Sequence, residues 1–176
     1  MTDRPILFSG AMVRALLAGS KTQTRRLATS PQMQRVEVGD RLWVRESFTH
    51  ISNRNAPPSA LYAADFEEFE KPDRDWDWTP SIFMRRGASR LTLTVTDIRT
   101  MPLQNISHED ARDEGVERFR IDMSTPFPPS IMSDCSYRLG FWNIWNSLHT
   151  KAGERWDDNP GVIAITFTVE RRNIDA

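Results

Sequence analysis

Apolar and polar residues alternate in three stretches of the chain, and this alternation predicts β-strands. The clearest stretch is 91–96, where Leu91, Leu93 and Val95 alternate with threonines. The segment 41–48 alternates in the same way, and a last predicted strand follows a turn at 158–161. One face of that last strand is apolar and carries Ile163, Ile165, Phe167 and Val169.

A helical period of apolar residues replaces this alternation near the start of the chain. Met12, Leu16 and Leu17 predict a helix over about 10–18. Ser9 is suited to begin this helix, and Gly19 is suited to end it because glycine readily adopts the left-handed conformation. We therefore expect the residues after Gly19 to leave the helix at a fixed corner.

The rest of the chain predicts two more helices and one long irregular segment. Ser107 and Asp110 have the spacing of a capped start for a short helix that ends at Gly115, and 139–148 predicts a strongly apolar helix. Residues 49–90 are broken by prolines and predict an irregular insertion. Within that insertion we expect a short strand near 60–63, and we expect a loop at 120–136.

Strands separated by short helices, without a regular strand–helix–strand series, favour an α+β fold over a doubly wound sheet. We expect a small mixed β-barrel with flanking short helices. A chain of 176 residues is long enough for one domain with a real core and short for two. We therefore expect a single domain over 1–176 that contains the insertion at 49–90.

Composition excludes several classes of protein. With 39% hydrophobic and 27% charged residues the chain can bury a core and does not resemble a disordered tail. No apolar run approaches the ~18 residues of a membrane span, and the first residues lack the pattern of a signal peptide, so we expect a cytoplasmic protein and no membrane partner. The single Cys135 and the three histidines show no metal-ligand spacing, so we expect no metal and no cofactor.

Charge is distributed unevenly, although the formal net charge is only −1. Residues 1–50 carry an excess of four positive charges, and residues 65–77 carry an excess of five negative charges. These two segments can pair, can bracket a cleft, or can both form solvated surface.

Glu46 lies in register with an apolar face of the predicted strand at 41–48, which also carries Leu42, Val44 and Phe48. Burying an unpaired carboxylate costs several kcal/mol, so a buried Glu46 needs a cationic or hydrogen-bonding partner. The alternative is that Glu46 lies at the wet end of its strand.

A cationic cluster follows the helix stop directly, and polar groups at such corners are often functional. Its pattern, Gly19-x-Lys21-x-x-Thr24-x-Arg26, resembles the signature of the ASCH family, which follows the first helix of a PUA-like β-barrel. Further segments resemble the phage and prophage branch of that family: Pro5-Ile6-Leu7-Phe8-Ser9-Gly10, Gly39-Asp40-Arg41-Leu42-Trp43-Val44-Arg45-Glu46, Ala88-Ser89-Arg90-Leu91-Thr92 and Trp156-Asp157-x-Asn159-Pro160.

The resemblance implies a possible catalytic set. One branch of the ASCH family is similar to an amidohydrolase that removes the acetyl group of N4-acetylcytidine with a lysine, a threonine and a glutamate. By position these correspond to Lys21, Thr24 and, in the short helix before Gly115, Glu114.

Such a set has a plausible chemistry. A threonine hydroxyl needs a base to take its proton, and a lysine serves as that base only when burial or neighbouring cations such as Arg25 and Arg26 make it neutral. A glutamic acid can then protonate the departing amine. Alternatively, Lys21, Arg25 and Arg26 hold phosphates while the hydroxyl of Thr24 adds a contact, and no catalysis takes place.

The leading hypothesis is therefore a basic pocket that binds a nucleotide or a modified base in RNA. In the second hypothesis the chain is a non-catalytic RNA-binding module, whose stacking and charged residues are Trp76, Trp78, Phe83, Arg85, Arg86 and Arg90. Those tryptophans can equally cover the core. A ribonuclease is a third possibility, but His50, His108 and His149 lie in distant segments and form no evident pair.

We also expect residues that bind the ligand without acting in catalysis. These candidates are Arg25, Arg26, Arg45, Glu46 and Arg90. Between the two candidate carboxylates, we expect Glu46 to anchor a basic side chain of the segment 21–26 and Glu114 to meet the ligand. The oligomeric state stays open.

Overall fold

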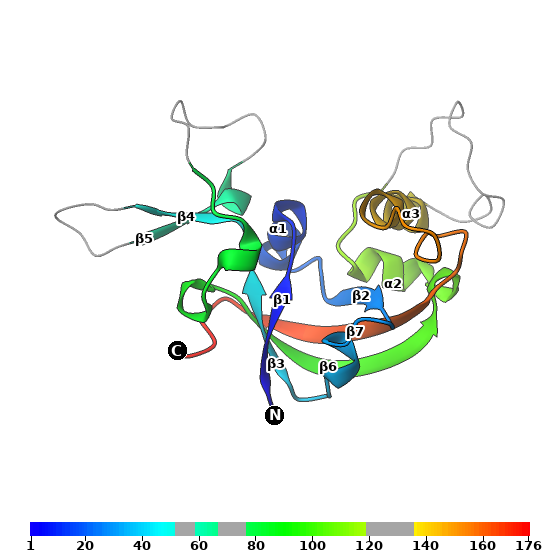
Figure 1. The fold of residues 1–176 in the computed structure, drawn as a ribbon, viewed down its shortest axis with the longest axis horizontal. Helices are drawn as coiled ribbons and strands as arrows, with labels where there is room; N and C mark the ends of the chain where they lie inside the picture. The colour runs from blue at the N-terminus through cyan, green and yellow to red at the C-terminus, as the bar shows by residue number, and fades with distance from the viewer. Residues whose placement is uncertain (52–58, 67–76, 119–135) are drawn as a thin grey trace.

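Five strands of the chain form one mixed sheet in the order β1-β3-β6-β7-β2 (Figure 1). The computed structural model describes residues 1–51, 59–66, 77–118 and 136–176. The pair β1–β3 is parallel and the other pairs are antiparallel. The strands are β1 (Asp3–Leu7), β2 (Gln23–Leu27), β3 (Arg41–Arg45), β6 (Thr92–Pro102) and β7 (Gly161–Glu170).

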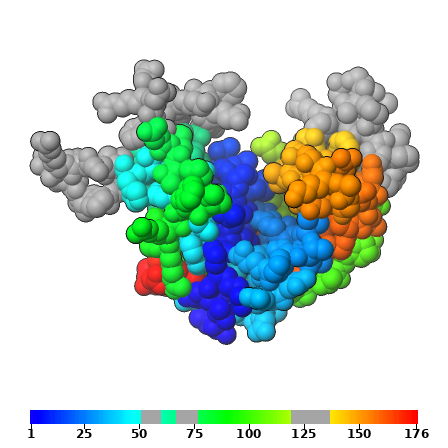
Figure 2. Space-filling view, in the orientation of Figure 1, coloured from blue at the N-terminus to red at the C-terminus, as the bar shows by residue number. Residues whose placement is uncertain are grey.

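Three α-helices lie on the same side of this curved sheet (Figure 1). They are α1 (Gly10–Ala18), α2 (His108–Asp113) and α3 (Ser136–Leu148). A separate hairpin of β4 (Phe48–Ile51) and β5 (Ser59–Tyr62) projects from the body of the molecule (Figure 1 and Figure 2). The short 3-10 helices are η1 (Met33–Arg35), η2 (Ala63–Asp65), η3 (Ser81–Phe83), η4 (Arg86–Ala88) and η5 (Leu103–Asn105).

The expected mixed α+β architecture is confirmed, whereas a closed barrel is not formed among the described residues. The strands β1 and β2 are the two edges of the sheet and share no ladder. A side chain links them instead, because Nη2 of Arg26 in β2 donates a hydrogen bond to the carbonyl oxygen of Leu7 in β1 at 3.0 Å.

The helix predicted at 10–18 is confirmed, and Gly19 ends it with a φ of 75°. The N–H of Gly19 donates to the carbonyls of Ala15 and Leu16, as in a left-handed helix end. Ser9 occupies the N-cap position, but its side chain makes no capping bond. The short helix at 108–113 is also confirmed, since the hydroxyl of Ser107 accepts a hydrogen bond from the amide of Asp110.

Two hydrophobic cores flank β7. The first lies under α1 and includes the predicted apolar face of β7, with Ile163, Ile165 and Phe167 buried. The second lies between α2 and α3 and includes Val162, which points to the other face of β7. β7 is therefore buried on both faces near its start, which a strict alternation does not predict.

Other elements differ from the sequence prediction. The stretch 41–48 is divided between β3 and β4, although the predicted face is buried as expected. β1 and β2 were not predicted, and β6 extends well beyond 96 to Pro102. The predicted loop at 120–136 lies almost entirely outside the described residues, as do parts of the insertion at 49–90.

Candidate functional site

A pocket of about 410 Å³ opens beside the two edge strands. Its walls come from the end of β1, the start of α1, β2, the end of α2 and one face of α3 with the residue that follows it. The polar and charged part of the lining consists of Ser9, Lys21, Thr24, Arg25, Arg26, Ser47, Ser81, Glu114 and His149. The structure thus brings the whole candidate catalytic set, Lys21, Thr24 and Glu114, to one cavity.

Lys21 is held by three acceptors, and its side chain is only 1% exposed. Its Nζ donates to the carbonyl oxygens of Gln23 at 2.9 Å and Glu114 at 2.8 Å, and to Oε2 of Glu114 at 2.9 Å. Burial lowers the pKa of Lys21, although the Glu114 carboxylate acts in the opposite direction. Three acceptors around one nitrogen match the three N–H groups of an ammonium, so this geometry describes the protonated lysine.

Arg25 shares the carboxylate of Glu114 with Lys21. Its Nη1 donates to Oε1 of Glu114 at 3.1 Å and to the side-chain oxygen of Gln23 at 2.6 Å. Its Nη2 donates to Asp110 at 2.7 Å, and Asp110 also accepts a hydrogen bond from Arg99 at 2.9 Å. Glu114 is consequently the anchor of the basic cluster.

The predicted role of Glu46 as that anchor is wrong. Its two carboxylate oxygens accept hydrogen bonds from Nε and Nη2 of Arg90 at 2.9 and 3.0 Å, and Arg90 also binds Asp65. Burial raises the pKa of Glu46, and the bonds from Arg90 oppose this effect. Because β3 ends at Arg45, Glu46 lies where the chain turns into the hairpin and faces Arg90 just before β6 rather than β2.

Three of the candidate ligand-binding residues do not line the pocket. Neither Glu46 nor Arg90 lines it, and neither does Arg45, whose guanidinium lies 5.5 Å from the ring of Trp43. The proposed stacking set is also elsewhere: Trp78 contacts Phe66, and Trp76 is outside the described residues. Phe83 and Arg85 line a different cavity beside the β4–β5 hairpin, while Arg86 forms ion pairs with Asp3 and Asp175.

Arg26 differs from its neighbours because it has no carboxylate partner in the described part of the chain. Its Nη1 donates to Oγ1 of Thr24 at 2.6 Å and to the carbonyl of Arg25 at 2.9 Å, and its Nη2 donates to Leu7. Burial lowers the pKa of Arg26, and only Glu114 counteracts this effect. Two of the five guanidinium N–H groups make none of these bonds, so they remain available for an acceptor.

Aromatic rings form another part of the pocket wall, and the Phe141 ring lies 6.0 Å from the guanidinium of Arg25. Phe141 and Trp145 lie 5.8 Å apart, and His149 is stacked on Trp145 at 3.9 Å with an interplanar angle of 12°. The guanidinium of Arg26 lies 5.1 Å from the Phe8 ring. The pocket therefore combines cationic donors with flat apolar surfaces.

His149 is the pocket residue that sequence reasoning missed. Its Nδ1 lies 3.0 Å from the carbonyl oxygen of Trp145, which can only accept, so Nδ1 carries a hydrogen. In the neutral ring Nε2 is then an acceptor. The available sequence signal was the spacing of four residues from Trp145, which places both side chains on one face of a helix.

The described residues contain no candidate metal-binding cluster and no candidate membrane-spanning helix. Among them, no three His, Cys, Asp or Glu side chains gather to hold a metal ion. No helix there is long and apolar enough to cross a membrane.

Comparison with known proteins identifies no family for this chain. No family model and no curated protein sequence matches the chain. An ASCH domain from Lactobacillus crispatus JV V101 is 11% identical, with a TM-score of 0.48 over 96% of this chain and 79% of that one. A protein of family DUF984 from Enterococcus faecalis V583 is 10% identical, with a TM-score of 0.49 over 99% of this chain and 83% of that one. Neither a fold nor a residue role carries over from these two structures.

Proposed function

We propose that the pocket binds a nucleotide or a modified base in RNA, with phosphate on Arg26 and the ring against the aromatic wall. The observation that carries this proposal is the guanidinium of Arg26, which is partly buried, lies on the pocket lining and has no carboxylate partner among the described residues. A partly desolvated cation without a carboxylate in direct contact is costly, and an anionic ligand would supply such a contact.

The charge balance of the whole lining supports an anion. Lys21, Arg25 and Arg26 face the pocket together with one carboxylate, that of Glu114, which is already shared by Lys21 and Arg25. Asp110 adds a second carboxylate behind Arg25 but is itself shared with Arg99. The cluster thus stays positive on a chain whose formal net charge is −1. Arginine forks are well suited to phosphate because they offer paired donors.

The apolar part of the lining supports a ring. Small-molecule sites usually have volumes of roughly 300–1,000 Å³, and the pocket of about 410 Å³ falls within that range. Bases taken out of a helical stack are commonly held against aromatic side chains. Phe8, Phe141 and Trp145 line the pocket with largely buried rings, and His149, stacked on Trp145, is the partly exposed flat ring beside them.

Calorimetric titration with cytidine, cytidine 5′-monophosphate (CMP) and N4-acetylcytidine tests the proposal. We expect CMP to bind at least about tenfold more tightly than cytidine at low salt, because charged hydrogen bonds contribute about 1.5–3 kcal/mol. This preference should shrink as salt is raised, since exposed phosphate contacts are screened. Equal binding of CMP and cytidine at every salt concentration would exclude a phosphate site.

Hydrolysis of an N-acyl group on cytidine is the second candidate, favoured because Lys21, Thr24 and Glu114 meet in one pocket. The three acceptors around Nζ suit an ammonium, so in this reaction Lys21 first passes a proton to Oε2 of Glu114, 2.9 Å away. The neutral amine then takes the proton of Thr24 as Oγ1 attacks the acyl carbon, and Glu114 returns its proton to the departing cytosine amine. Water finally hydrolyses the acyl-threonine to acetate.

Mass analysis of N4-acetylcytidine incubated with the protein distinguishes the two candidates. Release of cytidine that disappears in Thr24→Ala and persists in part in Thr24→Ser supports hydrolysis. Binding of CMP without any release of cytidine supports a binding pocket alone. Adding a short RNA to the same assay also tests for ribonuclease products.

A further inference from the structure

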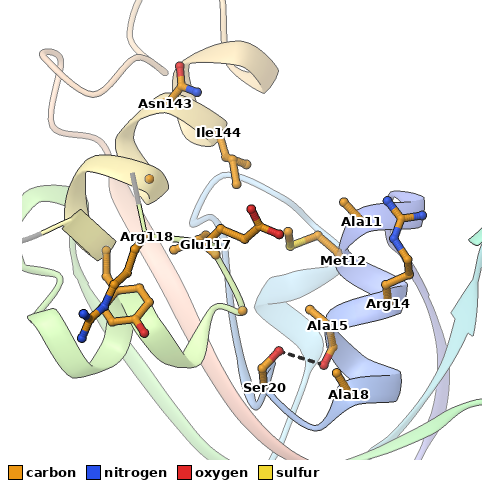
Figure 3. A pocket seen from close by; sticks show the side chains of 14 residues that line it. Ala11, Met12, Arg14, Ala15, Ala18, Ser20, Glu117, Arg118, Asn143 and Ile144 are labelled. Carbon is orange, nitrogen blue, oxygen red and sulfur yellow. Dashed lines mark hydrogen bonds between the residues drawn. The ribbon is translucent and has the colours of Figure 1, made fainter. Parts of the chain in front are cut away.

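A second groove, of about 830 Å³, lies beside the pocket between α1 and the segment that follows α2 (Figure 3). Its α1 side carries Ala11, Ala15 and Ala18, whose short side chains leave the groove open. Its other side is formed by residues 115–118 and by α3.

The groove and the pocket adjoin each other. Met12 on α1 and Ile144 on α3 line both of them, so these two side chains lie at the boundary between the two spaces. A ligand longer than the pocket would reach the groove by passing over this boundary. The groove is also the larger of the two.

Two arginines make the groove suitable for a chain of phosphates. Arg14 and Arg118 are exposed and line it, and neither forms an ion pair within the described residues. Arg14 lies at the rim, where its Nη1 donates a hydrogen bond to the carbonyl oxygen of Ala64 at 3.4 Å. The guanidinium of Arg118 lies 5.1 Å from the ring of Tyr137, which forms a cationic stacking surface. Glu117 opposes this charge, and Figure 3 shows its side chain extending toward Met12.

We propose that the natural ligand is a single-stranded oligonucleotide, with one nucleotide in the pocket and its neighbours in the groove along Arg14 and Arg118. This inference rests on the proposed function. The strand is single because a base must be unpaired to enter the pocket. Cationic side chains with interleaved aromatic rings are the usual means of holding such strands without sequence preference.

The test compares CMP with a tetramer of oligocytidylate RNA by fluorescence or calorimetric titration. We expect the tetramer to bind at least about tenfold more tightly than CMP at low salt, because each extra phosphate contact releases counterions. The double variant Arg14→Gln/Arg118→Gln should lose this gain while CMP binding stays within about twofold. Its salt dependence should also fall, by about 0.7 in logarithmic slope for each lost contact.

Two further variants control the experiment. Glu117→Gln should change the tetramer affinity in the opposite direction, because it removes the negative charge that faces the strand. Arg35→Gln should change nothing, since Arg35 is an exposed arginine that lines neither the pocket nor the groove. Circular dichroism verifies that each variant is folded.

The outcomes separate this inference from the proposed function. CMP binding with no gain for the tetramer overturns the inference and leaves the proposed function intact. A gain that survives in the double variant also overturns it, because the strand then follows another path. Absence of binding by CMP and tetramer alike contradicts both.

Discussion

At the scale of single residues, Glu114 balances the charge of the pocket, because its one carboxylate accepts from both Lys21 and Arg25. Glu114→Gln keeps the shape but leaves two buried cations with one fewer counter-charge. We expect the free energy of unfolding to fall by about 3–5 kcal/mol, as for other buried pairs that lose one partner. Urea denaturation at pH 7 measures this loss.

Glu46→Gln is the matched comparison. Arg90 keeps Asp65 as a partner and is partly exposed, so we expect a smaller loss of about 1–3 kcal/mol. Binding of CMP should be unchanged, since Glu46 does not line the pocket. A larger loss for Glu46→Gln than for Glu114→Gln would contradict this assignment of anchors.

The sequence predicted which basic residues lie at the pocket, but it did not predict which carboxylates form ion pairs with them. Lys21, Thr24 and Arg26 follow a helix stop at Gly19, and that local corner was readable from residue types alone. The pairing of Lys21 with Glu114 spans 93 positions in the chain, and that of Arg90 with Glu46 spans 44. Such pairings depend on how distant elements pack, so local patterns left both carboxylates as candidates.

At the scale of elements, the end of α2 is locked against the corner after α1. Gly115 has a φ of +75°, and a Cβ added there would lie 2.7 Å from the Cβ of Lys21 and 2.8 Å from that of Ala15. Gly115→Ala should therefore cost about 2–4 kcal/mol of stability through overpacking and left-handed strain. It should also weaken CMP binding, because Lys21 must move.

The variant Gly153→Ala measures the conformational strain of a left-handed position without the overpacking that occurs at Gly115. Gly153 has a φ of +84° but no neighbour within 4 Å of the added Cβ, so only the conformational cost of about 1–2 kcal/mol applies. Thermal denaturation of both variants gives the comparison. Equal losses in the two variants would show that the close approach at Gly115 is not important.

Elements with an apolar period were predictable, and elements with polar interiors were not. Helix 10–18 and the strands near 91–96 and 163–169 show clear patterns, and the structure confirms them. β2 has the sequence Gln-Thr-Arg-Arg-Leu, and its buried side chains are Gln23, Thr24 and Arg25. A strand that buries a hydrogen-bonded charge network carries no hydrophobic alternation, so its pattern resembles a loop.

At the scale of the whole molecule, two aspartates join segments that are distant in the chain. Burial disfavours the charged form of Asp40, but hydrogen bonds from the Thr2 amide, Arg4 and the Glu37 amide outweigh it and lower its pKa. The pKa of Asp110 is lowered likewise, since Arg99 and Arg25 outweigh its burial. Both pKa values thus lie below the ordinary value of 3.8.

A lowered carboxyl pKa predicts the direction of acid sensitivity. The ionised aspartates stabilise the fold fully above pH values near 3.8, and this contribution is lost as the pH falls through their folded pKa values. Asp40→Asn and Asp110→Asn should each lower stability at pH 7 and have progressively less effect toward pH 2. Denaturation curves measured across this range should converge on the wild-type curve, whereas a constant difference would contradict the linkage.

For the molecule as a whole, the sequence predicted the fold class but not the closure of the sheet. Short helices between strands indicated a mixed α+β fold, and the structure confirms it. The expected barrel depended on how two edge strands meet, and here they are joined by the side chain of Arg26 rather than by a ladder. That hydrogen bond also holds Arg26 at the pocket. The candidate site therefore lies where the two edge strands of the sheet fail to pair.

The most direct test of the central claim is the ratio of the dissociation constants of cytidine and CMP in wild type, Arg26→Gln and Arg35→Gln. If Arg26 receives the phosphate, wild type and Arg35→Gln should prefer CMP by at least about tenfold at low salt. Arg26→Gln should bind both ligands within about twofold of each other, while circular dichroism shows an intact fold. A folded Arg26→Gln variant that keeps the full preference for CMP would contradict the account.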